Sequence, residues 1–192
     1  MDATQFDLVV GWAAYLSAAA TIGTAITGVL FFVLRGRFGP INDAVSVLQM
    51  LVMLPVAAGL YLVIRRSDSG LALIATVPGV LGMLVAALLQ ALLVVRVVRY
   101  EQTIGAVLAA GGGIGLWLVL ANILALVGSA LPVGLAICGI IAGMGYVLLA
   151  VGFRIGGQEH PLSYAGAGAM LVGYTVWAIW LGYLFASGAL AG

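Results

Sequence analysis

Residues 44–64 have the sequence AVSVLQMLVMLPVAAGLYLVI and contain no charged side chain. A stretch of roughly 20 predominantly apolar residues is long enough to cross the hydrocarbon core of a bilayer as a helix. Arg65 and Arg66 follow this stretch directly, and two guanidinium groups mark the return of the chain to water. The stretch therefore predicts a membrane-spanning helix.

Five further stretches have the same apolar character and similar length. Together they predict six spans, at about residues 8–34, 44–64, 71–95, 104–127, 133–153 and 164–187. No stretch shows the ten-residue alternation of a membrane barrel, and short connectors separate the spans. The predicted fold is all-α: one transmembrane domain over residues 1–192, built as a bundle of six helices.

The composition supports a lipid-facing surface. Of the 192 residues, 65% are hydrophobic and 7% are charged, with a net charge of +1, whereas a soluble domain has roughly 25% charged residues. This balance excludes a cytosolic enzyme and a secreted disulfide scaffold. It also provides no basic patch for nucleic acid, so we expect the lipid bilayer as the surroundings and no nucleic-acid partner.

The positive charges predict how the spans are oriented. The first, third and fifth connectors carry most of the arginines (Arg35, Arg37, Arg96, Arg99 and Arg154), and the second carries Arg65 and Arg66. Arginine-rich connectors stay in the cytoplasm, so both termini are predicted to lie outside. The absence of lysine and the abundance of Ala, Gly, Leu and Val indicate a bacterial protein, which we expect in the cytoplasmic (inner) membrane.

The aromatic residues suggest anchors at one interface of the membrane. All four tryptophans fall in the outer half of the predicted spans, together with three tyrosines (Trp12, Trp117, Trp177, Trp180, Tyr15, Tyr61 and Tyr183). Indole and phenol rings are enriched at headgroup level. We therefore expect these side chains to form an outer aromatic belt.

Small residues predict which helix faces pack together. Gly111 and Gly115 form one GxxxG pattern and Gly139 and Gly143 form another. This pattern lets two helix backbones approach closely, so the fourth and fifth spans are expected to cross there. Two further stripes are expected to face inward: Ser17, Thr21, Thr24 and Gly28 in the first span, and Gly79, Gly82, Ala86 and Gln90 in the third.

Uncharged polar residues within the spans are the candidates for binding a ligand. Gln49 and Gln90 lie about five residues from the inner ends of adjacent spans, so we expect them to pair at one depth. With Thr24 and Asn122 they make up the candidate ligand-binding set. The alternative is a hydrogen bond that fixes helix register and contributes about 0.6 kcal/mol.

A second candidate site lies in the connectors of the predicted inner face. It comprises Arg96, Arg99, Glu101, Arg154, Glu159 and His160, beside Tyr100. Arg96 and Arg99 are three residues apart and expected to share a helix face, where guanidinium groups can clamp a phosphate of a headgroup or ligand. His160 beside Glu159 could exchange protons. The alternative is that these residues only anchor the topology.

Other chemistry is missing from the sequence. The predicted spans contain no ionisable residue, which disfavours a proton-coupled pump, and no lysine is present for a retinal Schiff base. There is no HExxH pattern, no cysteine–histidine cluster and no Gly-x-Ser-x-Gly elbow. We expect no catalytic residue, no metal and no cofactor.

Two stretches carry a resemblance to known proteins. Residues 41–55 (INDAVSVLQMLVMLP) with 60–65 (LYLVIR), and residues 172–182 (VGYTVWAIWLG), resemble small bacterial multi-helix membrane proteins classed as domains of unknown function. That resemblance implies architecture only. The six-span layout, with Ala14 and Ala18 in the first span, is also similar to substrate-binding subunits of energy-coupling-factor vitamin importers.

Three functions are compatible with these patterns. The leading hypothesis is a non-enzymatic membrane protein that acts as an accessory or packing partner, as a homo-oligomer or with another membrane protein, or that binds a small lipophilic molecule between its helices. The alternative is a transporter binding subunit or pore for a small neutral solute. A second alternative is a membrane enzyme acting on lipid at the cytoplasmic face.

Overall fold

The computed structural model describes residues 2–34 and 38–190, and this part of the chain contains six helices. They are α1 (Ala3–Val33), α2 (Gly39–Ile64), α3 (Ser69–Val94), α4 (Tyr100–Val127), α5 (Val133–Gly156) and α6 (Pro161–Ala186). All six are long and apolar enough to cross a membrane. The chain is therefore a multi-pass membrane protein, and the predicted all-α fold with six spans is confirmed.

Several helices begin or end outside the predicted spans, and polar side chains cap two of their first turns. The Asp2 carboxylate accepts a hydrogen bond from the Gln5 amide (2.7 Å), and the Asp68 carboxylate accepts one from the Leu71 amide (2.9 Å). Such caps satisfy first-turn N–H groups that have no partner within the helix. Four charged residues therefore lie within helices instead of outside them: Asp7, Asp43, Glu101 and Arg154.

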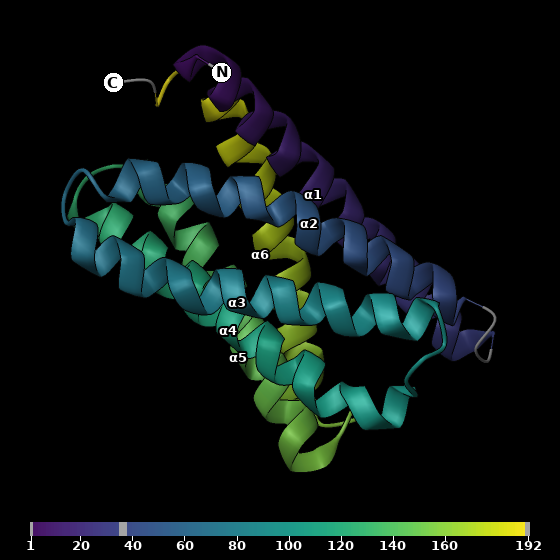
Figure 1. Ribbon diagram of the computed structural model, residues 1–192. Coiled ribbons are helices and arrows are strands. Elements are labelled where there is room, and N and C mark those ends of the chain that lie inside the picture. The colour runs from purple at the N-terminus through teal and green to yellow at the C-terminus, as the bar shows by residue number, and fades with distance from the viewer. Residues whose placement is uncertain (1, 35–37, 191–192) are drawn as a thin grey trace.

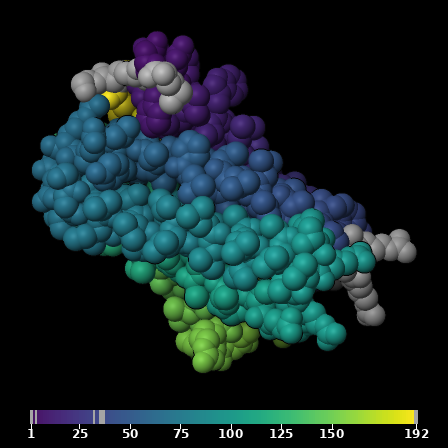
Figure 2. All heavy atoms as spheres, viewed as in Figure 1, coloured from purple at the N-terminus to yellow at the C-terminus, as the bar shows by residue number. Residues whose placement is uncertain are grey.

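The helices form a closed ring. Each helix packs against the next one along the chain, and α6 returns to pack against α1 (Figure 1). Among the described residues, the one helix pair in backbone contact across this ring is α2 and α4. In the space-filling view, α2 and α3 lie against each other on the face toward the viewer (Figure 2).

The ring of helices has two ends, and the connectors lie closer together at one end than at the other. At one end, here called the terminal end, the start of α1 and the end of α6 lie close together (Figure 1), and the Arg66 Nη2 atom of the α2–α3 connector donates to the Leu190 carbonyl (3.4 Å). The end of α1, the start of α2 and the α3–α4 and α5–α6 connectors lie at the opposite end, here called the loop end (Figure 1). Figure 1 shows the α5–α6 connector apart from the α3–α4 connector, because the helices diverge there.

Large aromatic side chains fill the interior of the ring. Trp117, Tyr174 and Trp177 are fully buried; the Trp117 and Trp177 rings meet edge to face at 6.1 Å, and the Tyr174 and Trp177 rings lie 5.6 Å apart. Buried aromatic rings in edge-to-face contact contribute a large apolar area. These three side chains therefore form the aromatic centre of the core.

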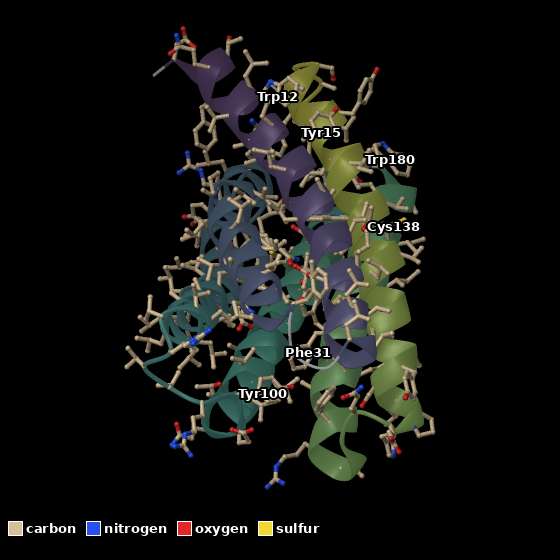
Figure 3. The ribbon with its side chains drawn as sticks, turned by 90° about the vertical axis from the view of Figure 1, so that its right-hand side faces the viewer. Trp12, Tyr15, Phe31, Tyr100, Cys138 and Trp180 are labelled. Carbon is tan, nitrogen blue, oxygen red and sulfur yellow. The ribbon has the colours of Figure 1, made fainter. Side chains whose placement is uncertain are left out.

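The predicted aromatic belt is partly wrong. Trp12, Trp180 and Tyr183 are exposed on the outer surface toward the terminal end, as expected (Figure 3 labels the two tryptophans), but Trp117 and Trp177 lie in the core. A helix that is apolar on every face does not reveal which face turns inward. The sequence therefore predicts how deep each aromatic residue lies in the membrane, but not whether its side chain points into the ring or out to lipid.

The predicted crossing of α4 and α5 is confirmed. A methyl group added to Gly115 would lie 2.6 Å from the Gly143 carbonyl oxygen, and one added to Gly143 would lie 2.6 Å from the Gly115 carbonyl oxygen. The backbones thus touch where both residues lack a side chain. Gly139 of the second pattern packs against the Asn122 side chain, whereas Gly111 has ordinary contact distances. Helix α4 is unbroken through residues 111–113.

Other neighbours in the ring meet through glycine in the same way. Gly11 of α1 and Gly182 of α6 each lie against the other helix's backbone, as do Gly145 of α5 and Gly166 of α6. On α3, Gly82 packs against the Ala110 carbonyl of α4. Glycine residues, which have no side chain, therefore lie at the α1–α6, α3–α4, α4–α5 and α5–α6 contacts.

We predict that Gly115→Ala destabilises the fold, because the new methyl group forces α4 and α5 apart. Overpacking of this kind costs about 1–3 kcal/mol. Gly105→Ala is the matched control on the same helix, since a methyl group there meets nothing within 4 Å, and it should be neutral or slightly stabilising. The measurement is the unfolding midpoint of both variants in detergent; equal midpoints would contradict the proposed packing.

Candidate functional site

Polar side chains line up where α1 packs against α2. Ser17, Thr21, Thr24 and Thr27 recur at intervals of three and four residues and so share one face of α1. Opposite them on α2 lie Gln49 and Asn42, and Thr27 and Asn42 are joined by a 3.0 Å side-chain hydrogen bond. We call these six residues the polar seam; their α1 members extend over about 15 Å of helix.

Gln49 is the hub of the polar seam. Its Nε2 atom donates to the Thr21 hydroxyl (2.8 Å) and to the Tyr146 hydroxyl of α5 (3.4 Å), and its Oε1 atom accepts from the Thr24 hydroxyl (3.3 Å). The Gln49 side chain is 4% exposed. The Gln49 amide therefore links α1, α2 and α5 inside the ring. Because lipid offers no hydrogen-bond partners, the amide has to find them within the protein.

Two tyrosines carry the polar seam across the ring. The Tyr174 hydroxyl of α6 donates to Ser17 Oγ (2.9 Å), and the Tyr146 and Tyr174 rings meet edge to face with centroids 6.4 Å apart. Neither tyrosine was singled out from the sequence. A signal was present, because both lie in the middle of a span, where a phenol hydroxyl must find a partner within the protein.

Asn122 belongs to a separate pair. Its Oδ1 atom accepts from the Trp177 indole N–H (2.9 Å), and its Nδ2 atom donates to the Leu118 carbonyl (2.8 Å). The Asn122 side chain fits against Gly139, which has no side chain. This pair ties α4 to α6 and leaves the Asn122 amide nitrogen and oxygen both occupied.

The predicted pairing of Gln49 with Gln90 is wrong. Gln49 is bonded to α1 and α5, and the Oε1 atom of Gln90 is buried without a hydrogen-bond partner among the described residues. The two helices are neighbours, but Gln49 faces away from α3. Of the candidate ligand-binding set, the structure brings together Thr24 and Gln49, while Gln90 and Asn122 lie elsewhere.

The surface of the described chain is hollowed in at least two places. One, of about 330 Å³, lies between α1 and α6, and another, of about 310 Å³, lies at the terminal end. Neither is lined by Gln49, Gln90, Thr24 or Asn122. The candidate ligand-binding set therefore lies away from these two hollows.

Arg96 and Arg99 do not share a helix face. Helix α3 ends at Val94, and Arg96 follows in a left-handed conformation (φ 59°). The amides of Arg96 and Val97 then donate to the Leu93 and Leu92 carbonyls (3.0 and 2.9 Å), which is a Schellman ending. Arg99 begins the next helix as its N-cap. The predicted phosphate clamp from one helix face is therefore wrong.

The remaining inner-face candidates occupy helix ends. His160 is the N-cap of α6 and its Nδ1 atom accepts from the Leu162 amide (3.2 Å), while Glu159 beside it is exposed. Glu101 lies in the first turn of α4 and Arg154 in the last turn of α5, where each charge complements the helix dipole. Because the α3–α4 and α5–α6 connectors lie apart (Figure 1), these residues do not form one site.

Comparison with known proteins leaves the family open. The chain matches no protein-family model, and no curated protein or solved structure compared with it is significantly similar. Within residues 2–34 and 38–190, no group of three or more His, Cys, Asp or Glu residues could hold a metal ion. The resemblance to small bacterial membrane proteins stays a prediction.

We predict that Gln49→Leu lowers the free energy of unfolding by about 1–2 kcal/mol, because it removes the hydrogen bonds that join α2 to α1 and α5. Gln90→Leu is the matched control: its buried Oε1 atom has no partner, so the change should be neutral or stabilising. Unfolding of both variants in mixed micelles measures the difference. A larger loss for Gln90→Leu would refute Gln49 as the hub.

Proposed function

We propose that this protein is a non-enzymatic protein of the bacterial cytoplasmic membrane that binds a small lipophilic molecule between its helices. The groove between α1 and α6 carries this proposal. It holds about 330 Å³, exposes only apolar surface and is lined by Ile22, Ala25, Ile26, Leu171, Val172, Thr175 and Val176. Ligand pockets commonly measure about 300–1,000 Å³.

The position of the groove determines the chemistry of its occupant. Residues 22–26 and 171–176 lie well inside α1 and α6, at a depth where a bilayer contains hydrocarbon and no water. An alkyl or isoprenoid chain matches such a lining. The Thr175 hydroxyl is buried beneath this lining, with no hydrogen-bond partner among the described residues, so the groove presents only hydrocarbon to its occupant.

The orientation belongs to the same proposal. Arg96, Arg99 and Arg154 lie at the loop end, whereas Arg65 and Arg66 lie at the terminal end; Arg35 and Arg37, which the sequence assigns to the first connector, fall outside the described residues. The arginine-rich end stays in the cytoplasm. We therefore place both termini on the outer side of the membrane.

We predict that Ala25→Phe blocks the groove. A diazirine-bearing palmitic acid, added to the protein in nanodiscs, should label peptides with residues 22–26 and 171–176 saturably, because one site holds one chain. Ala25→Phe should lower this labelling about tenfold. The control is Ala19→Phe, an exposed position of α1 that does not line the groove. Labelling that does not saturate, or that is equal in both variants, would rule the site out.

A second candidate function is a binding subunit or pore for a small neutral solute. The polar seam favours it, because a solute inside the ring could take over the hydrogen bonds that Gln49, Thr21 and Thr24 now make with one another. Light scattering of proteoliposomes in glycerol measures this function. Gln49→Leu should slow swelling about tenfold relative to Gln90→Leu, and a wild-type rate equal to that of empty vesicles would eliminate the candidate.

A further inference from the structure

A polar notch lies at the terminal end, where three segments far apart in sequence meet. The α2–α3 connector, the α4–α5 connector and the segment after α6 enclose a hollow of about 310 Å³. Its lining residues are Val63, Arg66, Ser67, Gly128, Ser129, Ala130, Ala189 and Leu190. We call this hollow the terminal notch; it is separate from the groove between α1 and α6.

The two sides of the terminal notch differ in character. Val63 is buried, and Ala130 and Leu190 are partly buried and packed against the core, so the inner wall is apolar. Arg66, Ser67 and Ser129 are exposed, so the rim carries one positive charge and two hydroxyl groups. A molecule that fits both walls has an apolar part and an adjoining polar, negatively charged part.

The two neighbouring arginines of this connector have different surroundings. Arg66 lines the notch, and its Nη2 atom donates to the Leu190 carbonyl (3.4 Å). A guanidinium has five N–H donors, so most of them are left for a ligand. Arg65 instead lies over the Tyr61 ring, with its Cζ atom 5.9 Å from the centroid, and does not line the notch.

The serine of the α4–α5 connector occupies a position that normally favours glycine. Ser129 has φ 51°, and the Ala130 amide donates to the Ala125 carbonyl (2.8 Å), which is again a Schellman ending of the helix. Glycine would adopt this conformation without strain. Gly128 is needed next to it, because a side chain there would overlap Ser67. The strained residue therefore places a hydroxyl group on the rim.

We infer that the terminal notch binds a phosphate group, and that a phospholipid headgroup supplies it. A guanidinium donates charge-assisted, bidentate hydrogen bonds to phosphate oxygens, and the serine hydroxyl groups of the rim add neutral donors. The notch lies at the ends of membrane-spanning helices, which is headgroup level, and its apolar inner wall matches the first methylenes of the lipid chains. The nearby Asp68 carboxylate is engaged in capping α3 through the Leu71 amide (2.9 Å).

Native mass spectrometry with added phosphatidylglycerol tests this inference. Arg66→Gln should weaken lipid binding about tenfold, because it removes the one charge on the rim. Arg65→Gln is the matched control, since it removes an equal charge from the adjacent position outside the notch, and it should bind like the wild type. Equal losses in both variants would overturn the inference, because they would indicate attraction to the end of the molecule as a whole.

A further measurement separates binding from folding. Ser129→Gly relieves the left-handed strain, so the unfolding midpoint of this variant should rise while its lipid binding weakens about threefold. Unchanged binding would remove Ser129 from the site.

Inorganic phosphate is the second probe, and it identifies the source of the phosphate group. Arg66-dependent binding of phosphatidylglycerol but not of inorganic phosphate supports a headgroup site, and equal Arg66-dependent binding of both supports a site for free phosphate. Arg66-independent binding of both overturns the inference.

Discussion

Close contact between helix backbones is the interaction on which the rest of this structure depends. Lipid is as apolar as a leucine side chain, so helices gain nothing by burying apolar faces against one another. They gain instead from dense packing, which needs small residues at the points of contact. Gly115 with Gly143, Gly145 with Gly166, and Gly11 with Gly182 provide those points. The last pair brings α6 back to α1 and so closes the ring.

Closing the ring creates an interior that has to be filled and whose polar groups need partners. Fully buried aromatic rings fill it, and Gln49 joins three helices through hydrogen bonds to Thr21, Thr24 and Tyr146. Hydrogen bonding is incomplete among the described residues, which provide no partner for the buried atoms Gln90 Oε1, Thr175 Oγ1 and Trp117 Nε1. An unpaired polar atom in such surroundings is costly. These three atoms therefore lower the stability of the fold.

The two hollows suit two parts of a lipid-like molecule. The α1–α6 groove lies at mid-span and exposes only hydrocarbon, whereas the terminal notch lies at the helix ends and combines an apolar wall with Arg66. Neither hollow is lined by the fully buried aromatic residues of the ring. Hollows on the outside of the ring can contact lipid directly, which is why we propose lipid binding ahead of solute passage.

The sequence by itself determined the helices, their order and the α4–α5 crossing, because uninterrupted apolar length and the GxxxG patterns are local properties. It also identified Ser17, Thr21, Thr24 and Gln49 as inward-facing polar residues, since each is unfavourable toward lipid. Only the tertiary structure decided which of them meet. The sequence of a helix that is apolar on every face does not show which face points into the ring. For this reason the sequence could not predict the burial of Trp117 and Trp177 or the separation of Gln49 from Gln90. It also could not predict the hydrogen bonds of Tyr146 and Tyr174. Likewise, the terminal notch is assembled from three distant segments, and only the closed ring brings them together.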